Sequence, residues 1–114
     1  MLIPASVQIH LAVEPVDLRN SIDGLAGMVE RRFGDDPVCG HVFVFHNRTR
    51  TGLKFLVWDH GGFVLVYKRL ERGRFRIPQA QGGRVRMTSA ELGALMEGID
   101  LTRARRLPRW NPAR

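Results

Sequence analysis

The chain has 114 residues, of which 44% are hydrophobic and 25% are charged, and these values are typical of one folded domain and exclude a disordered chain. It carries 18 Lys and Arg against 11 Asp and Glu, a net charge of +7, which favours a polyanionic partner. No apolar run approaches the ~18–20 residues that cross a bilayer, and the first residues lack the basic start of a secretory signal, so we expect a cytoplasmic protein without a membrane partner.

The first predicted elements are a strand and a long helix. Residues 7–14 alternate apolar and polar side chains, as a strand does, and Pro15 ends the pattern. Asp17 is the predicted N-cap of a helix that runs to Phe33, because apolar residues recur every three or four positions over this stretch. Gly34 then fits the C-cap position.

Three short strands follow, at residues 41–46, 53–58 and 63–70, and two polar turns separate them. This spacing predicts an antiparallel meander. The three segments are apolar at nearly every position. We therefore expect both faces of the sheet to be covered, one by the helix and the other by further strands, the C-terminal region or a second copy of the chain.

Two later segments, 74–77 and 84–87, alternate arginine with an apolar residue. Paired as a hairpin, they would place all four arginines on one face, with neighbours ~6–7 Å apart along each strand. Such a β-ribbon can follow a phosphate backbone or enter a major groove. The alternative is a solvated sheet face whose charges protect an edge from aggregation.

The chain ends on a short helix and a basic tail. Thr88 and Glu91 have the spacing of a capping box that opens a helix over residues 92–96, with Gly98 as its end. The sequence thus predicts an α+β fold in a single domain, residues 1–102: an antiparallel β-sheet of about five or six strands, one long N-terminal helix and a short C-terminal helix. Residues 103–114 are a predicted flexible basic tail.

Charge is unevenly distributed along the chain. Residues 1–47 hold three arginines against six acidic residues, whereas residues 48–114 hold fifteen Lys and Arg against five acidic residues. Sixteen of the 18 cations are arginine, whose planar fork suits phosphate and guanine contacts, although a GC-rich genome produces the same bias. The candidate nucleic-acid-binding residues are Lys68, Arg69, Arg72, Arg74, Arg76, Arg84, Arg86, Arg103, Arg105 and Arg106.

No catalytic, cofactor-binding or metal-binding motif is predicted. A metal-dependent nuclease needs converging carboxylates, and a set of Lys54, Asp59 and Glu71 matches that requirement only in loose order and spacing. The four histidines lack ligand spacing, and one cysteine cannot form a structural zinc site. Cys39 is expected to pack and not to react. We therefore expect a protein without enzymatic activity or cofactor.

Several motifs, taken together, resemble a known family. They are Asp17-Leu18-Arg19, Asp23-Gly24-Leu25, Asp36-Pro37, the run from Gly40 to Phe45, the run from Lys54 to Asp59, Gly62-Phe63, the run from Tyr67 to Phe75, and the run from Leu95 to Asp100. Over residues 3–102 the chain resembles the TnpB accessory protein that the second reading frame of family-sixty-six insertion sequences encodes. The run from Lys68 to Phe75 is the most specific part. Val66 and Ile77 depart from the family pattern, which often has aromatic residues there.

The resemblance implies an accessory role in transposition beside a separate DDE-type transposase of the same element, in a bacterial, nucleoid-associated setting. Two molecular roles stay open. The chain either binds DNA, at transposon ends or non-specifically, or is an interaction module that binds the transposase without touching DNA. The strands that are apolar on both faces, and the helix that contains glycines, are also compatible with a homodimer.

Overall fold

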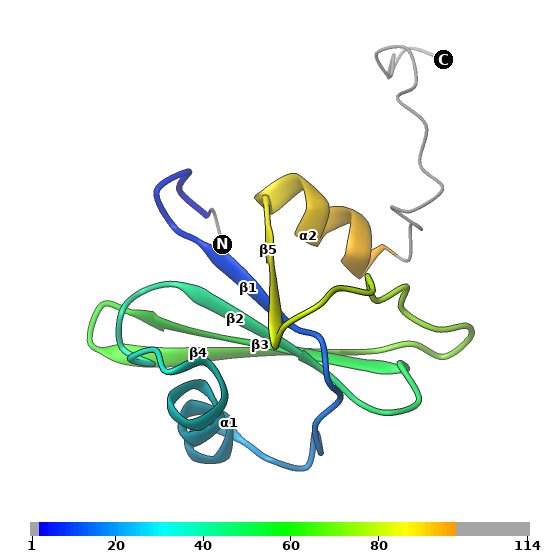
Figure 1. Cartoon of the computed structure of the whole chain (residues 1–114), viewed down its shortest axis with the longest axis horizontal. Helices are drawn as coiled ribbons and strands as arrows, with labels where there is room; N and C mark the ends of the chain where they lie inside the picture. Colours follow the sequence, from blue (N-terminus) through cyan, green and yellow to red (C-terminus); the bar gives the residue numbers. More distant parts are fainter. Residues whose placement is uncertain (1–2, 98–114) are drawn as a thin grey trace.

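A five-stranded sheet with one helical segment on each face forms the fold, and the computed structural model describes residues 3–97 of it (Figure 1). The strands are β1 (Ile9–Ala12), β2 (Val42–His46), β3 (Gly52–Asp59), β4 (Gly62–Arg69) and β5 (Arg84–Met87). The helices are α1 (Ile22–Met28), which continues into the π-helical turn η1 (Val29–Phe33), and α2 (Ser89–Met96). The predicted α+β class is confirmed, whereas the predicted tail, residues 103–114, lies outside the residues that the structure describes.

The sheet is mixed, so the prediction of a purely antiparallel sheet is wrong. Its strand order is β4-β3-β2-β1-β5, with β1 and β2 parallel and every other pair antiparallel. The β2-β3-β4 meander is confirmed. The parallel pair follows from the connection between β1 and β2, which contains the α1–η1 segment and is long enough for a crossover.

The N-terminal helix is shorter than predicted, because Asp17 is not its N-cap. The Asp17 carboxylate accepts a hydrogen bond from the Arg19 backbone N–H (2.9 Å), and the Asp17 carbonyl accepts one from the Asn20 N–H (3.1 Å). This local turn competes with helical hydrogen bonding, so the helix begins only after Ser21. Its end was predicted correctly: Gly34 takes the left-handed C-cap conformation, at φ 66°.

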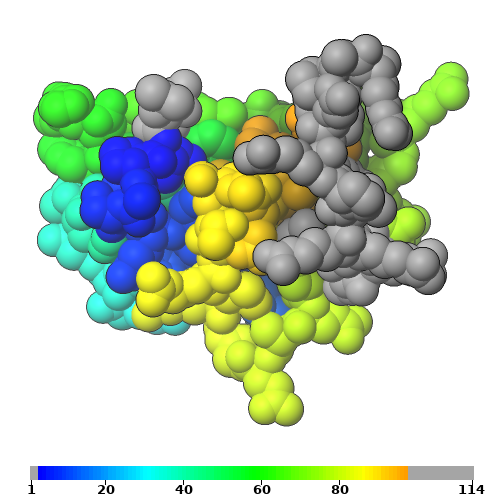
Figure 2. Space-filling model, turned by 90° about the horizontal axis from the view of Figure 1, so that it is seen from above, coloured from blue at the N-terminus to red at the C-terminus, as the bar shows by residue number. Residues whose placement is uncertain are grey.

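The predicted arginine hairpin does not form. Residues 74–77 contain no strand, and β5 pairs along its length with β1 instead (Ile9↔Met87, Ala12↔Arg84). Figure 2 shows β5 in yellow beside β1 in blue. The backbone groups of β5 form their hydrogen bonds with the edge of β1. Phe75 is not in a strand, and its side chain packs in the core. The predicted alternation of 84–87 holds, since Met87 packs in the core and Arg86 is exposed.

Each face of the sheet has its own hydrophobic core. This agrees with the prediction that both faces are covered, which was based on strands that are apolar at nearly every position. On one face, Leu25 of α1 and Val29 of η1 pack on Phe43, Phe45 and neighbouring residues. On the other face, α2 packs on the opposite side chains of the same strands, and Phe75 from the loop after β4 joins them. The sheet is therefore covered on both sides, with β4 and β5 at its edges.

The nearest neighbours of the two helix glycines within residues 3–97 are side chains, not the backbone of the sheet. A Cβ at Gly24 would lie 2.4 Å from Asn20 Oδ1, and one at Gly27 would lie 2.7 Å from Arg31 Nη1. Both positions are thus crowded by side chains of their own segment. Within residues 3–97 no helix is long and apolar enough to cross a bilayer.

Candidate nucleic-acid interface

The turn between β2 and β3 presents two arginines on a fixed backbone. The Asn47 Oδ1 atom accepts hydrogen bonds from the N–H groups of Thr51 and Gly52, both at 3.0 Å. The Arg50 N–H donates to the Asn47 carbonyl at 3.0 Å and holds Arg50 in the left-handed region, at φ 59°. The exposed side chains of Arg48 and Arg50 therefore project from a well-bonded turn.

The loop after β4 brings further arginines to this turn. Phe75 is 1% exposed, and its N–H donates to the Arg50 carbonyl at 2.7 Å. A second backbone hydrogen bond lies closer to the sheet, where the Leu70 N–H donates to the Thr51 carbonyl at 2.8 Å. Arg74 and Arg76 flank the buried Phe75, and both are exposed. A buried aromatic residue and two backbone hydrogen bonds thus anchor the loop beside the turn.

These two segments form a surface that we call the arginine cluster. Its members are the exposed residues Arg48, Arg50, Arg72, Arg74 and Arg76. Within residues 3–97 none of the five forms an ion pair with a carboxylate. The turn and the loop lie at the same end of the sheet in Figure 1, and the loop, yellow-green in Figure 2, projects from the margin of the molecule.

A shallow pocket of about 520 Å³ separates the cluster from the end of β1. Arg48 and Arg50 line it, together with residues 77–80 and with Glu14. Glu14 is the one acidic residue in this lining, and it does not pair with either arginine. The field of this end of the sheet is therefore positive, as a phosphate-binding surface requires.

Several of the residues predicted from the sequence are engaged in contacts with the protein itself. Arg84 pairs with Asp35 and lies over the Phe33 ring, 5.5 Å from its centroid. Arg69 Nη2 lies 3.5 Å from Glu71 Oε1. The β-ribbon with four arginines on one face is thus not present, and Arg84 is neutralised by a carboxylate.

Lys68 also has a structural contact. Its Nζ donates to the Met96 carbonyl at 2.6 Å, at the C-terminal end of α2. Arg86 lies exposed on β5, away from the arginine cluster. Arg103, Arg105 and Arg106 fall outside the residues that the structure describes. Of the predicted set, the structure brings together Arg72, Arg74 and Arg76.

Arg48 and Arg50 are not among the residues predicted from the sequence, because residues 47–52 have the pattern of a polar turn. A usable signal was present: two arginines in a six-residue turn, without an acidic residue among them. What the sequence does not show is that Arg50 accepts the backbone hydrogen bond of Phe75, which is what joins the turn to the loop.

Arg19, by contrast, is paired with a carboxylate. Its Nη2 lies 2.6 Å from Asp17 Oδ2, and Nε lies 3.0 Å from both Asp17 oxygens. These hydrogen bonds lower the pKa of Asp17 to about 2, so the carboxylate is charged at neutral pH. The pair is close to neutral and adds little to the field of the cluster.

Within residues 3–97 no group of three or more His, Cys, Asp or Glu is placed to hold a metal ion. His10 is buried, stacks on Phe43 at 5.5 Å between ring centroids, and has no partner for Nδ1 among these residues. Burial first, and then the charge of Arg84, lower the pKa of His10. Cys39 is exposed, so the expectation that it packs is wrong.

Comparison with known proteins identifies relatives over almost the whole chain. Residues 7–106 match the family described as IS66 Orf2 like protein. An uncharacterized protein of Sinorhizobium fredii, y4jC, is 35% identical over 108 residues, which cover 95% of this chain and 92% of the relative. A second one from the same organism, y4hO, is 37% identical over 95 residues, covering 83% of each chain.

No solved structure matches the chain significantly. The family match extends over both arginine-bearing segments of the cluster and over every element of the sheet. This extent agrees with the motifs that carried the resemblance, from Asp17 to Asp100. The chain belongs to the family of IS66 Orf2 like proteins, the accessory proteins of IS66 insertion sequences.

Proposed function

We propose that this protein serves IS66 transposition by binding DNA, without catalysis, and that the arginine cluster is its phosphate-binding surface. The observation that carries the proposal is five exposed arginines on two anchored segments, none of them neutralised by a carboxylate of residues 3–97. Arginines held on a fixed backbone lose less conformational entropy on binding than arginines of a flexible arm. Contacts to phosphates position a protein on DNA and bring strong salt dependence.

The backbone of Arg50 gives independent support. A side chain in the left-handed region costs ~1–2 kcal/mol, and glycine is the residue that avoids this cost. Arg50 nevertheless occupies such a position, at φ 59°. Strain of this kind concentrates at functional sites, which fits a side chain that is kept for contact with a ligand.

Fluorescence anisotropy with labelled duplex DNA tests the proposal. We expect the double variant Arg50→Ala/Arg74→Ala to bind about five- to thirty-fold more weakly, since two exposed charge contacts of ~0.5–1 kcal/mol each are lost. The matched control is Arg31→Ala/Arg32→Ala, which removes two exposed arginines from η1, outside the two segments of the arginine cluster. Arg50→Gly should weaken binding without loss of stability. Equal affinity of the two double variants would refute the proposed surface.

Binding to the transposase is a second candidate role, and the edge strand β4 favours it. β4 is eight residues long, it contains no proline, and its side chains at 63–66 are only partly buried. Such an edge can accept a strand from another chain, either a segment of the DDE-type transposase or a second copy of this protein. Capture of the element's transposase by the protein in the absence of DNA would support this role, and failure to capture it would exclude it.

A further inference from the structure

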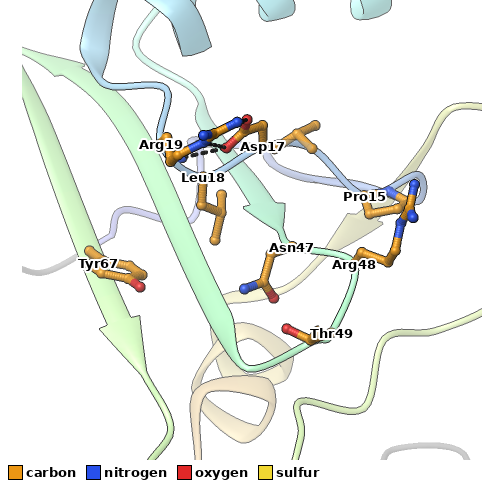
Figure 3. A pocket seen from close by; sticks show the side chains of 9 residues that line it. Pro15, Asp17, Leu18, Arg19, Asn47, Arg48, Thr49 and Tyr67 are labelled. Carbon is orange, nitrogen blue, oxygen red and sulfur yellow. Dashed lines mark hydrogen bonds and ion pairs between the residues drawn. The ribbon is translucent and has the colours of Figure 1, made fainter.

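A second concavity adjoins the arginine cluster on the side of α1. It has a volume of about 590 Å³, within the ~300–1,000 Å³ range of ligand pockets. Three segments line it: residues 15–19 after β1, residues 47–49 of the β2–β3 turn, and Tyr67 on β4 (Figure 3). Arg48 belongs both to this pocket and to the arginine cluster.

The walls of the pocket converge over Gly52. A Cβ at this position would lie 2.9 Å from Leu18 Cδ1, 3.2 Å from Asn47 Nδ2 and 3.3 Å from Tyr67 Cε1. These three side chains come from the three segments that line the pocket. Because Gly52 has no side chain, Tyr67 can approach the turn closely.

Tyr67 is a large aromatic residue placed at the surface and held there. It is 52% exposed, and Val38 is the only other large hydrophobic residue with comparable exposure in residues 3–97. The Lys54 Nζ lies 5.2 Å from the ring centroid. Lys54 itself donates to the carbonyls of Leu18 (2.6 Å) and Asn20 (3.0 Å), so the cation that contacts the ring is fixed.

The charges of the pocket favour a phosphate on the side of Arg48 (Figure 3). The Asp17 carboxylate is neutralised by Arg19, whereas Arg48 forms no ion pair within residues 3–97. The pocket therefore combines an exposed aromatic ring, a free guanidinium and a near-neutral rim. A single strand of DNA has the matching parts, because its bases stack on aromatic rings and its phosphates pair with arginine.

We propose that this pocket binds an unpaired segment of DNA, with one base stacked on Tyr67 and the phosphate of a neighbouring nucleotide on Arg48, which lies on the opposite side of the pocket (Figure 3). The occupant must be unpaired, because the faces of a base within a duplex are covered by its neighbours. The inference rests on the proposed function, which supplies the DNA, and adds a preference for single-stranded segments or for ends with unpaired bases.

The test compares three labelled DNAs: a single strand, a blunt duplex and a duplex with a single-stranded extension. We expect the wild-type protein to bind the single strand and the extended duplex more tightly than the blunt duplex. Tyr67→Ala should lower the affinity for the single strand by about five- to 150-fold, the equivalent of ~1–3 kcal/mol for one stacked base. Its affinity for the blunt duplex should not change.

Three further variants make the test specific. Tyr67→Phe keeps the ring and should bind the single strand like the wild type. Gly52→Ala places a methyl group where the walls converge and should weaken single-strand binding. Val38→Ala removes the other exposed hydrophobic side chain and should have no effect. A fluorescent adenine analogue in the single strand should be quenched by the wild type, by Tyr67→Phe and by Val38→Ala, but not by Tyr67→Ala. Thermal unfolding verifies that each variant is folded.

The outcomes of these experiments distinguish a wrong pocket proposal from a wrong proposed function. If Tyr67→Ala binds the single strand like the wild type while Arg50→Ala/Arg74→Ala loses affinity for the duplex, the pocket proposal is wrong and the arginine cluster stands. If the wild type binds no DNA even at low salt, both proposals are wrong.

Discussion

His10 shows at the scale of one residue how the sheet restricts ionisation. The residue is 4% exposed, and its Nε2 atom lies 3.1 Å from Gln8 Oε1. Arg86 is its cross-strand neighbour, and Arg84 is close enough to disfavour a second positive charge. Both burial and these arginines favour the neutral imidazole, which is why the pKa of His10 is lowered.

The lowered pKa predicts a loss of stability in acid. In the unfolded chain His10 takes up a proton near its ordinary pKa of 6.5, whereas in the folded protein it does so only at lower pH. Its contribution to stability is therefore fully present above pH 6.5 and is lost as the pH falls through the folded-state pKa. Denaturant unfolding at several pH values should show a decline in the free energy of unfolding from that point downward.

The variant His10→Phe keeps a ring against Phe43 and removes the titrating group, so its decline should be shallower than that of the wild type. His60→Gln provides a control, because His60 is an exposed histidine in the β3–β4 turn. Identical pH profiles for wild type and His10→Phe would show that His10 does not contribute to the acid sensitivity.

At the scale of elements, α2 is held at both ends by polar contacts. Thr88 Oγ1 accepts from the Glu91 N–H (3.1 Å), while Glu91 Oε1 accepts from the Thr88 N–H (2.9 Å), so the predicted capping box is confirmed. At the other end Lys68 donates to the Met96 carbonyl, which connects α2 to the edge strand β4. A cation at the C-terminal end also interacts favourably with the helix dipole.

These contacts predict that two substitutions destabilise the fold. Thr88→Ala should lower the free energy of unfolding by about 1 kcal/mol, because the Glu91 N–H loses its acceptor, Thr88 Oγ1. Lys68→Met should lower it by ~0.3–1 kcal/mol through loss of the contact with the helix end. Urea unfolding measures both. Wild-type stability of Lys68→Met, combined with weakened DNA binding, would instead assign Lys68 to the interface.

The elements also show which features can be predicted from this sequence. Local signals were sufficient for the capping box, for Gly34 at the end of η1 and for the β2-β3-β4 meander, because each depends on residues close in the chain. The partner of β5 could not be predicted in that way. The alternation of 84–87 fits a hairpin and a pairing with β1 equally well, and only the position of Phe75 in the core decides between them.

The candidate site was predicted in part for the same reason. The arginines of residues 72–76 were identified from their density, but their neighbours across space, Arg48 and Arg50, were not. The predicted phosphate-binding geometry was based on a ribbon, whereas the structure holds these side chains on a turn and a loop joined by the hydrogen bond between Phe75 and Arg50. Local sequence patterns carry no information about such a contact.

At the scale of the whole molecule, basic side chains gather at one end of the sheet. The β2–β3 turn and the loop after β4 meet there, whereas the β3–β4 turn, which contains Asp59 and His60, lies at the opposite end of β3 and β4 (Figure 1). An asymmetric field of this kind orients a protein on a polyanion and speeds association. The faces of the sheet are covered, so the edge strand β4 is the part of the sheet that we propose for a protein partner.

The most direct test of this account is the salt dependence of duplex binding for wild type, Arg50→Ala/Arg74→Ala and Arg31→Ala/Arg32→Ala. Each lost phosphate contact should reduce the slope of log affinity against log salt by roughly 0.9. We predict a slope shallower by nearly two for the Arg50/Arg74 variant and an unchanged slope for the control. Parallel slopes for all three proteins would contradict the assignment of the arginine cluster as the DNA-binding surface.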